Sequence, residues 1–437
     1  MERSIAALLH CQTNWYNPPM RLRVTSMTYG PHGIGRHGGK AVFVRGVAPG
    51  EDVEVDVREP HASFDYAELR EIVRPSPSRR QPPCRYLPRC GGCPWQHLDY
   101  SLQLEAKSAN LHESLRRIAG MPELTPRPIL TAGEELGYRS RLTLRVEAGE
   151  VGFYAAASHD LVTIDACLLA SPTVAAALPA AATLAAQLSS RLRRLEIAER
   201  GFAAGVVFHG EVEGKLAASD SARLDTWLQQ QPVAGVTLAG KGWRRVWGDD
   251  RIAIRPEPDL ELITRAGTFT QVNPAANQRL VAEVIALAEI NADEAILDVY
   301  AGAGNLSLPL ARRARRVVAI EQDLHAAADA RAAAAAAGLT GFEVVRGIAR
   351  RALQAQIQAS AYYDTIVLDP PRSGAAEVID SVLRLSPRKL VYVSCNPTTL
   401  ARDLKELARK FRIDVVQPID LFPQTYHLET VVRATRR

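Results

Sequence analysis

The sequence contains no long hydrophobic run. Its longest weakly polar stretch, PTVAAALPAAATLAAQL at residues 172–188, is rich in alanine and is interrupted by Pro179. A membrane-spanning helix needs roughly 20 strongly apolar residues, so this stretch does not qualify. The opening MERSIAALLHCQ also lacks the long apolar region and the small-residue cleavage site of a secretory signal. We therefore predict a cytoplasmic protein with no membrane partner.

Cysteine is scarce, and strong compositional bias is absent. Six cysteines occur in 437 residues, while 47% of the chain is hydrophobic and 23% is charged. These proportions exclude extensive disorder and allow sizeable cores. The length exceeds one ordinary domain and predicts two to four.

Arginine outnumbers lysine and gathers in one proline-rich stretch, RPSPSRRQPPCRYLPR at residues 74–89. The planar guanidinium group grips phosphate better than an ammonium group does. This stretch is therefore either a contact surface for nucleic acid or a solvated linker between domains.

Three regions differ in their hydrophobic pattern. Residues 18–74 alternate in the manner of a small β-barrel of the OB type, with turn residues between the runs. Residues 137–265 read mainly as short strands, whereas strands and helices alternate from residue 276 onward, which predicts a doubly wound domain. The fold class is thus α/β plus β, with domains at residues 1–78, 79–265 and 266–437. Helices are expected at 100–120, 276–290, 305–314, 324–337 and 376–385.

The stretch VYVSCNPTTLARDL, residues 391–404, places a cysteine at the end of an apolar strand. Proline cannot donate to a strand ladder, so Asn396-Pro397 must leave the sheet directly after Cys395. Ligands bind at the carboxyl ends of strands in open α/β sheets. Cys395 is therefore either a small core residue or a nucleophile that faces a pocket.

A glycine-containing turn follows another predicted strand in AILDVYAGAGNLSLPLARRARRVVAIEQD, residues 295–323. Gly302 and Gly304 allow a ligand to approach the backbone, and Glu321 can accept hydrogen bonds from ribose hydroxyls. A dinucleotide fingerprint would need a third glycine where Ser307 stands. The motif favours S-adenosylmethionine, and a nicotinamide enzyme or a structural turn are the alternatives.

A third strand, TIVLDPPRSG at residues 365–374, ends in Asp369. An acid at this position can hydrogen-bond a planar base beside a cofactor. The ends of all three strands are expected to meet at one edge of the sheet, which favours a site over a core role for Cys395.

In these motifs the chain resembles the RNA uracil-C5 methyltransferase family. The resemblance covers most of the chain, with a TRAM-like barrel at the N-terminus and five motifs in the family's order. These motifs are FTQVNPAANQ, DVYAGAGNLSLPLA, LDPPRSGA, VYVSCNPTTLARDL and DLFPQTYHLETVV.

The resemblance implies roles for individual residues. Cys395 would be the nucleophile and Glu429 the base that removes the C5 proton. The resemblance further implies that Gln271, Tyr300, Asn305, Glu321 and Asp369 contact the cofactor or the uracil ring. His427 would support the site or lie on the surface.

The chemistry explains why this family needs a cysteine. Uracil C5 is too poor a nucleophile to take a methyl group unaided. A thiolate that adds to C6 converts the ring into an enolate whose C5 can attack the sulfonium methyl group. A carboxylate then removes the C5 proton and the thiol leaves.

One position departs from the family pattern. Family members commonly carry Asp or Asn after the third strand to meet the adenine amino group, whereas this chain has Ile348 and Ala349 there. We expect weaker cofactor binding or a contact from the backbone. A catalytically silent RNA-binding relative is the corresponding alternative.

Four further cysteines predict a metal site. Cys84, Cys90 and Cys93 lie close together in CRYLPRCGGC, and Cys167 lies far downstream. In a cytoplasmic protein such thiols indicate a metal rather than disulfides. A three-plus-one arrangement suits a cubane iron–sulfur cluster better than zinc. The resemblance implies a [4Fe–4S] cluster at these four positions.

The expected activity is methylation of uridine C5 in structured RNA by a monomeric enzyme. We favour 23S ribosomal RNA, because family members without barrel and cluster tend to act on transfer RNA. Transfer RNA is the nearest alternative. A methyltransferase that acts on amino groups would use the cofactor turn and Asp369 but neither Cys395 nor Glu429.

Overall fold

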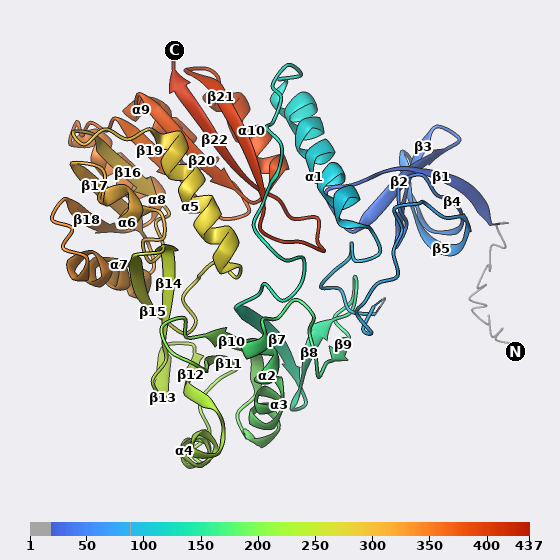
Figure 1. The fold of residues 1–437 in the computed structure, drawn as a ribbon, viewed down its shortest axis with the longest axis horizontal. Coiled ribbons are helices and arrows are strands. Elements are labelled where there is room, and N and C mark those ends of the chain that lie inside the picture. The colour runs from blue at the N-terminus through green and yellow to red at the C-terminus, as the bar shows by residue number, and fades with distance from the viewer. Residues whose placement is uncertain (1–18, 88) are drawn as a thin grey trace, which may run out of the picture. The chain divides into compact units, whose positions relative to one another are not determined.

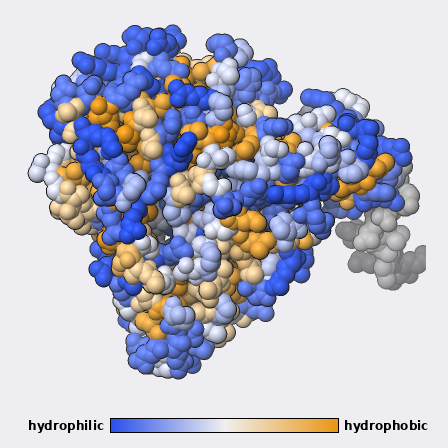
Figure 2. Space-filling view, viewed as in Figure 1, coloured by the Kyte–Doolittle hydropathy of each residue, from blue (hydrophilic) through white to orange (hydrophobic). Residues whose placement is uncertain are grey.

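The computed structural model describes residues 19–87 and 89–437. By its internal contacts the chain divides into two compact units, residues 1–79 and 80–437. The boundary predicted between residues 265 and 266 lies inside the second unit. Most of the predicted N-terminal extension lies outside the described residues. Hydrophilic side chains cover much of the face drawn in Figure 2, interrupted by apolar patches.

The first unit is a closed five-stranded barrel with the strand order β1-β2-β3-β5-β4. Strands β3 and β5 pair in parallel and the other neighbours are antiparallel. Alternate residues point inward, so valines and a leucine fill the interior. The barrel predicted for residues 18–74 is confirmed. Its strands are β1 (Met20–Met27), β2 (His32–His37), β3 (Lys40–Arg45), β4 (Asp52–Pro60) and β5 (Phe64–Arg74).

The second unit contains a seven-stranded sheet in the order β13-β12-β11-β10-β7-β8-β9. Its apolar face packs against short alanine-rich helices. The strands are β7 (Arg141–Glu147), β8 (Glu150–Tyr154), β9 (Leu161–Thr163), β10 (Leu192–Glu199), β11 (Val206–Val212), β12 (Val233–Gly240) and β13 (Trp243–Gly248). Helices α2 (Pro172–Ala176), α3 (Leu178–Gln187) and α4 (Asp220–Gln230) accompany them, and β14 (Arg251–Glu257) pairs with β15 (Leu260–Arg265).

An eight-stranded sheet forms the rest of the second unit, in the order β18-β17-β16-β19-β20-β22-β21-β6 (Figure 1). The strands from β18 to β20 are parallel, and β22 runs antiparallel to both of its neighbours. The chain reverses its winding direction between β16 and β19. The strands are β6 (Leu130–Thr131), β16 (Ala295–Val299), β17 (Arg316–Glu321), β18 (Phe342–Arg346), β19 (Thr365–Leu368), β20 (Lys389–Ser394), β21 (Phe411–Asp420) and β22 (Glu429–Arg436).

Helices connect these strands and cover the sheet. The helices predicted near 276–290, 305–314, 324–337 and 376–385 are confirmed with shifted ends, and two more, α8 and α10, complete the set. The helices are α5 (Pro274–Ala288), α6 (Ser307–Ala311), α7 (Leu324–Ala336), α8 (Ala349–Gln358), α9 (Ile379–Leu385) and α10 (Pro397–Leu407). No helix among the described residues is both long and apolar enough to cross a membrane.

Helix α1 (Tyr100–Ser114) packs against the C-terminal sheet although it precedes the central sheet in sequence. It continues as a π-helical turn, Leu115–Ala119, and ends at Gly120 with a positive φ of 72°. Leu111 and Leu115 join the same apolar core as α10. Strand β6 likewise pairs with β21. The C-terminal fold therefore recruits elements from upstream of the central sheet.

A buried ion pair anchors α1 to the end of β21. The Nζ of Lys107 lies 2.7 Å from Oδ1 of Asp420, and both side chains are fully buried. The hydroxyl of Tyr100 donates to the other carboxylate oxygen at 3.0 Å, and the backbone N–H of Phe422 donates to Oδ1. Asp420 thereby holds α1 beside the segment that leads into β22.

Removal of one partner should leave an uncompensated buried charge. We expect Lys107→Met to lower the free energy of unfolding of the second unit by about 3–5 kcal/mol, whereas the double variant Lys107→Met/Asp420→Leu recovers part of the loss. Urea unfolding followed by circular dichroism measures both. Lys405→Met, on the exposed side of α10, serves as the control, and a loss of similar size there would contradict the assignment.

Candidate active site

A cavity of about 800 Å³ opens at the carboxyl ends of the parallel strands, where the winding direction reverses. Ligands of open α/β sheets bind at this position. The cavity wall contains eight of the nine residues expected to bind cofactor or carry chemistry. These are Gln271, Tyr300, Gly302, Asn305, Glu321, Asp369, Cys395 and Glu429.

The turn after β16 is tied to the end of β17. The backbone N–H of Gly302 donates to one carboxylate oxygen of Glu321 at 2.8 Å, and the N–H of Asp323 donates to the other at 2.6 Å. Gly302 has a φ of +58° and Tyr300 a φ of +70°. The Tyr300 hydroxyl donates to Glu377 at 3.1 Å. The turn therefore holds Glu321 in a fixed orientation at the cavity.

Gly304 does not line the cavity, and the structure gives it a packing role. Its φ is +97°, and a Cβ built on it would lie 2.0 Å from Cδ1 of Leu308. Leu308 is fully buried, so the clash could not be relieved cheaply. Gly304 is thus required for the close approach of the turn to α6.

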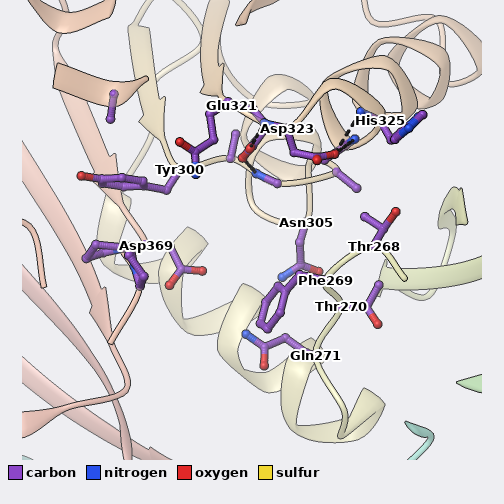
Figure 3. Close-up of a pocket in the computed structure, with 18 of the residues that line it drawn as sticks. Thr268, Phe269, Thr270, Gln271, Tyr300, Asn305, Glu321, Asp323, His325 and Asp369 are labelled. Carbon is purple, nitrogen blue, oxygen red and sulfur yellow. Dashed lines mark hydrogen bonds between the residues drawn. The ribbon is translucent and has the colours of Figure 1, made fainter. Parts of the chain in front are cut away.

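Figure 3 shows Glu321 and Asp323 on one side of the cavity and Phe269 and Gln271 on the other, with Asn305 between them. The side-chain amide of Asn305 exchanges two hydrogen bonds of 2.8 Å with that of Asn277 on α5. Phe269 is exposed. The cavity therefore has an acidic side that suits hydroxyl groups and an aromatic side that suits a ring.

Asp298 is fully buried near the end of β16 and supports the glycine turn that follows this strand. The hydroxyl of Ser307 donates to it, and burial raises the pKa of the carboxyl to about 7. Asp298 does not line the cavity, unlike Asp369. Ser307, where a dinucleotide fingerprint would have glycine, thus stabilises the turn from within.

Strand register places Cys395 beside Glu429. Ser394 at the end of β20 pairs with Thr430 on β22, so the next residue along β20 is level with the first residue of β22. Asn396 then begins α10, where its side chain accepts from the N–H groups of Thr398 and Thr399. The asparagine-proline pair thereby ends the strand and leaves the thiol at the cavity wall.

Burial and neighbouring carboxylates oppose ionisation in this part of the cavity. Burial raises the pKa of Cys395 to about 11, with further contributions from Glu429 and Asp369. Burial also raises the pKa of Glu429 well above its usual range, and Asp369 adds to this shift. Arg372 acts in the opposite direction on both Cys395 and Glu429.

Arg372 is a cavity residue that the sequence patterns did not single out. It follows Asp369-Pro370-Pro371 directly and lines the cavity. Its backbone carbonyl accepts weak hydrogen bonds of 3.4 Å from the side chains of Asn396 and Thr399. The signal that could have identified it was its place three residues after Asp369, within the motif TIVLDPPRSG.

His427 lines the cavity near Phe422 and Tyr426. Burial, together with the nearby cations Arg372, Lys107 and Arg139, lowers the pKa of its imidazole to about 3. The ring is therefore neutral near pH 7. The alternative of a surface histidine does not fit this position.

Ile348 and Ala349 do reach the cavity, as their position in the sequence implied. Ile348 precedes the first turn of α8 without a capping side chain and is 48% exposed. The preceding Gly347 donates its N–H to the carbonyl of Glu321 at 2.9 Å. Ile348 and Ala349 themselves can thus offer polar contacts only through their backbone.

Cys84, Cys90, Cys93 and Cys167 line one separate small pocket. Arg139, Tyr86 and several apolar side chains complete its wall. Burial raises the pKa of Cys93 to about 12. Within residues 19–87 and 89–437, no group of three or more His, Cys, Asp or Glu side chains is arranged to hold a single metal ion.

A solved structure shares the architecture of nearly the whole chain. The tRNA (uracil-54, C5)-methyltransferase of Pyrococcus abyssi, in complex with S-adenosyl-L-homocysteine, matches with a TM-score of 0.74 and 26% identity. The match covers 95% of this chain and 100% of that one. Together with the cavity at the strand ends, this similarity defines the second unit as a methyltransferase fold.

The family follows from sequence comparison. The family model described as tRNA (Uracil-5-)-methyltransferase matches residues 99–437. The 23S rRNA (uracil(1939)-C(5))-methyltransferase RlmD of Pectobacterium atrosepticum is 37% identical over 95% of this chain and 93% of that protein. The RlmD protein of Pseudomonas putida is 36% identical over 94% and 92%. The chain belongs to the uracil-C5 methyltransferase family.

The electrostatics of the cavity can be tested without RNA or cofactor. We expect the alkylation rate of Cys395 by iodoacetamide to rise continuously between pH 8 and 10, because its pKa is about 11. Arg372→Met should slow the reaction at each pH, since the cation that favours the thiolate is gone. Glu429→Gln should accelerate it, since a carboxylate that opposes the thiolate is gone.

Mass spectrometry of the peptide that contains Cys395 separates this reaction from alkylation of the other cysteines. Asp380→Asn, on the exposed surface of α9, is the control and should leave the rate unchanged. An Arg372→Met variant that reacts as fast as the parent would disprove the electrostatic coupling.

Proposed function

We propose that this protein is an S-adenosylmethionine-dependent RNA (uracil-C5)-methyltransferase that forms 5-methyluridine in 23S ribosomal RNA. The observation that carries the proposal is the placement of Cys395 and Glu429 side by side at the wall of the cavity that also contains the glycine turn. The RlmD relatives at 36–37% identity support ribosomal RNA as the substrate. Transfer RNA is the second candidate, as in the relative from Pyrococcus.

The glycine turn and its surroundings fit S-adenosylmethionine. Glu321 would accept from the ribose hydroxyls, and the backbone beside Ile348 would meet the adenine ring. Tyr300, Gly302, Asn305 and Gln271 would line the rest of the cofactor and the approach to uracil. When bound, this cofactor supplies an electrophilic methyl group.

Cys395 would start the reaction by forming a bond between its sulfur and C6 of uracil. The electrons of the C5=C6 double bond then move into the ring carbonyl as an enolate, and C5 becomes nucleophilic enough to take the methyl group. Because the pKa of Cys395 is about 11, few thiols are ionised at neutral pH. Arg372 favours the thiolate and lies where it can assist this step.

Glu429 would complete the reaction as a general base. It removes the proton from C5, the electrons restore the C5=C6 double bond, and the bond between C6 and sulfur breaks. Its raised pKa makes its carboxylate a stronger base than an exposed glutamate. Asp369 and Gln271, on the same wall, would hold the edge of the uracil ring.

The target uridine must leave its stack to reach this cavity, because C5 and C6 cannot be attacked while the base is stacked. The N-terminal barrel, interpreted as a TRAM domain, and the arginine-rich stretch at residues 74–89 would hold the surrounding RNA. The cytoplasmic location and the monomeric state stay predictions from the sequence.

We further propose that Cys84, Cys90, Cys93 and Cys167 hold a [4Fe–4S] cluster. Their side chains line one pocket, which supports a common ligand. Zn–S bonds of about 2.3 Å would bring four sulfurs within about 4 Å of one another around a single ion. The three-plus-one spacing of the cysteines along the chain suits a cubane cluster better than a zinc ion.

The central test uses RNA that contains 5-fluorouridine. Fluorine at C5 cannot leave as a proton does, so Cys395 should stay bonded to C6 after methyl transfer and give a covalent complex of protein and RNA. Cys395→Ala should form none. Glu429→Gln should still form it, whereas its turnover on ordinary RNA falls by about 10²–10⁴-fold.

Two outcomes would reject this mechanism. A covalent complex that survives Cys395→Ala would show another nucleophile, and methylation by Cys395→Ala would favour a methyltransferase that acts on amino groups. A catalytically silent RNA-binding protein would also explain the departure at Ile348 and Ala349. Calorimetric titration with S-adenosylmethionine decides that case, since the silent alternative predicts no heat of binding.

The cluster has its own test. We expect protein prepared without oxygen to contain equal amounts of iron and sulfide, with visible absorbance from thiolate-to-iron transitions. Cys93→Ser should lower the iron content, whereas the matched variant Cys395→Ser should not. Bound zinc, or iron that is lost with Cys395→Ser, would contradict the proposed cluster.

A further inference from the structure

The segment between β21 and β22, residues 421–428, leads directly into Glu429. Glu429 is the first residue of β22, so its position depends on how this segment enters the strand. Gln424 lies in the middle of the segment, fully buried, with a φ of +71°. A residue other than glycine keeps such a backbone conformation only when its surroundings hold it there.

Gln424 is held from outside its own segment by both its backbone and its side chain. Its N–H donates to Oε1 of Gln103 on α1 at 2.8 Å, and its carbonyl accepts from the N–H of Trp95 at 3.1 Å. Its side-chain oxygen accepts from Arg80 at 2.7 Å and from Gln103 at 3.1 Å. Its side-chain nitrogen donates to Glu135 at 3.0 Å.

Two neighbouring residues of the segment are anchored through their backbone carbonyls. The carbonyl of Pro423 accepts from the hydroxyl of Tyr138 at 3.0 Å, and that of Leu421 accepts from the side chain of Asn273 at 3.2 Å. Gln424 differs from both because its own side chain bonds three separate residues. It is therefore the point at which a side-chain substitution can loosen the segment.

Gln424 does not line the cavity, whereas Phe422, His427 and Glu429 do. It cannot touch a bound uracil and can influence the reaction only through the segment. Cys395, in contrast, directly follows β20 and precedes Asn396, the N-cap of α10. The β20–β22 pairing positions both reacting groups, and the segment that contains Gln424 adds a further restraint on Glu429.

We propose that Gln424 is a positioning residue that fixes the carboxylate of Glu429 over C5 of the uracil ring. This inference rests on the proposed function, in which Glu429 removes the C5 proton after methyl transfer. It implies that loosening the segment slows proton removal and leaves the addition of Cys395 and the methyl transfer unaffected. A carboxylate displaced by about 1 Å is expected to cost about 10²-fold in rate.

The experiment compares two reactions of Gln424→Ala. Covalent complex formation with 5-fluorouridine RNA requires addition and methyl transfer but no proton removal. Turnover on ordinary RNA requires all three steps. We expect turnover to fall by about 10²-fold, the rate of complex formation to match the parent, and methylated RNA bound to protein to accumulate on the ordinary substrate.

A matched control is available on β21, the strand that precedes this segment. Gln417 is also buried, and its side chain donates to the carbonyls of Pro128 and Pro418 instead of to this segment. Gln417→Ala should leave the ratio between the rate of complex formation and the rate of turnover unchanged. If Gln424→Ala fails to fold, Arg80→Met removes one of the same hydrogen bonds from a side chain that is 31% exposed, and the same selective loss is expected.

The rates of the two reactions test the positioning role of Gln424 and the proposed function separately. Equal loss of both reactions in the variant, or no loss of turnover, would overturn the positioning role of Gln424. An absence of covalent complex with the parent protein would instead reject the proposed function itself. The two failures are therefore distinguishable in one set of assays.

Discussion

The candidate site depends on one constraint, the register between β20 and β22. Parallel strands bring their carboxyl ends to one edge of a sheet, which gathers the glycine turn, Asp369 and Cys395. Glu429 lies at the start of its strand, so only an antiparallel strand can deliver it to the same edge. The pairing of Ser394 with Thr430 does this and fixes the carboxylate beside the thiol.

This arrangement has an electrostatic consequence that suits the proposed chemistry. A thiol and two acids share a poorly solvated wall, so the ionised forms of Cys395 and Glu429 are disfavoured in the absence of substrate. Arg372 offsets part of this effect. A base with a raised pKa is a stronger proton acceptor, and a nucleophile that is largely protonated is protected from side reactions. The anchored segment at residues 421–428 then fixes the position of the Glu429 carboxylate.

Much of the fold could be predicted from sequence because its signals are local. Alternating valines marked the barrel, and the alternation of strands and helices marked the sheet that carries Cys395 and Asp369. The packing of α1 against this sheet could not be predicted, because it depends on the long-range pair Lys107–Asp420. The packing role of Gly304 was also hidden, since a glycine motif alone does not separate ligand approach from contact with Leu308. Arg372 was missed because its influence on Cys395 arises only in three dimensions.

The most direct measurement of the central claim follows the hydrogen at C5. RNA labelled with tritium at C5 of uridine would be incubated with the protein and S-adenosylmethionine that carries a carbon-14 methyl group. The account predicts that tritium is released in an amount equal to the methyl groups transferred. Methyl transfer to the RNA without release of tritium would contradict it.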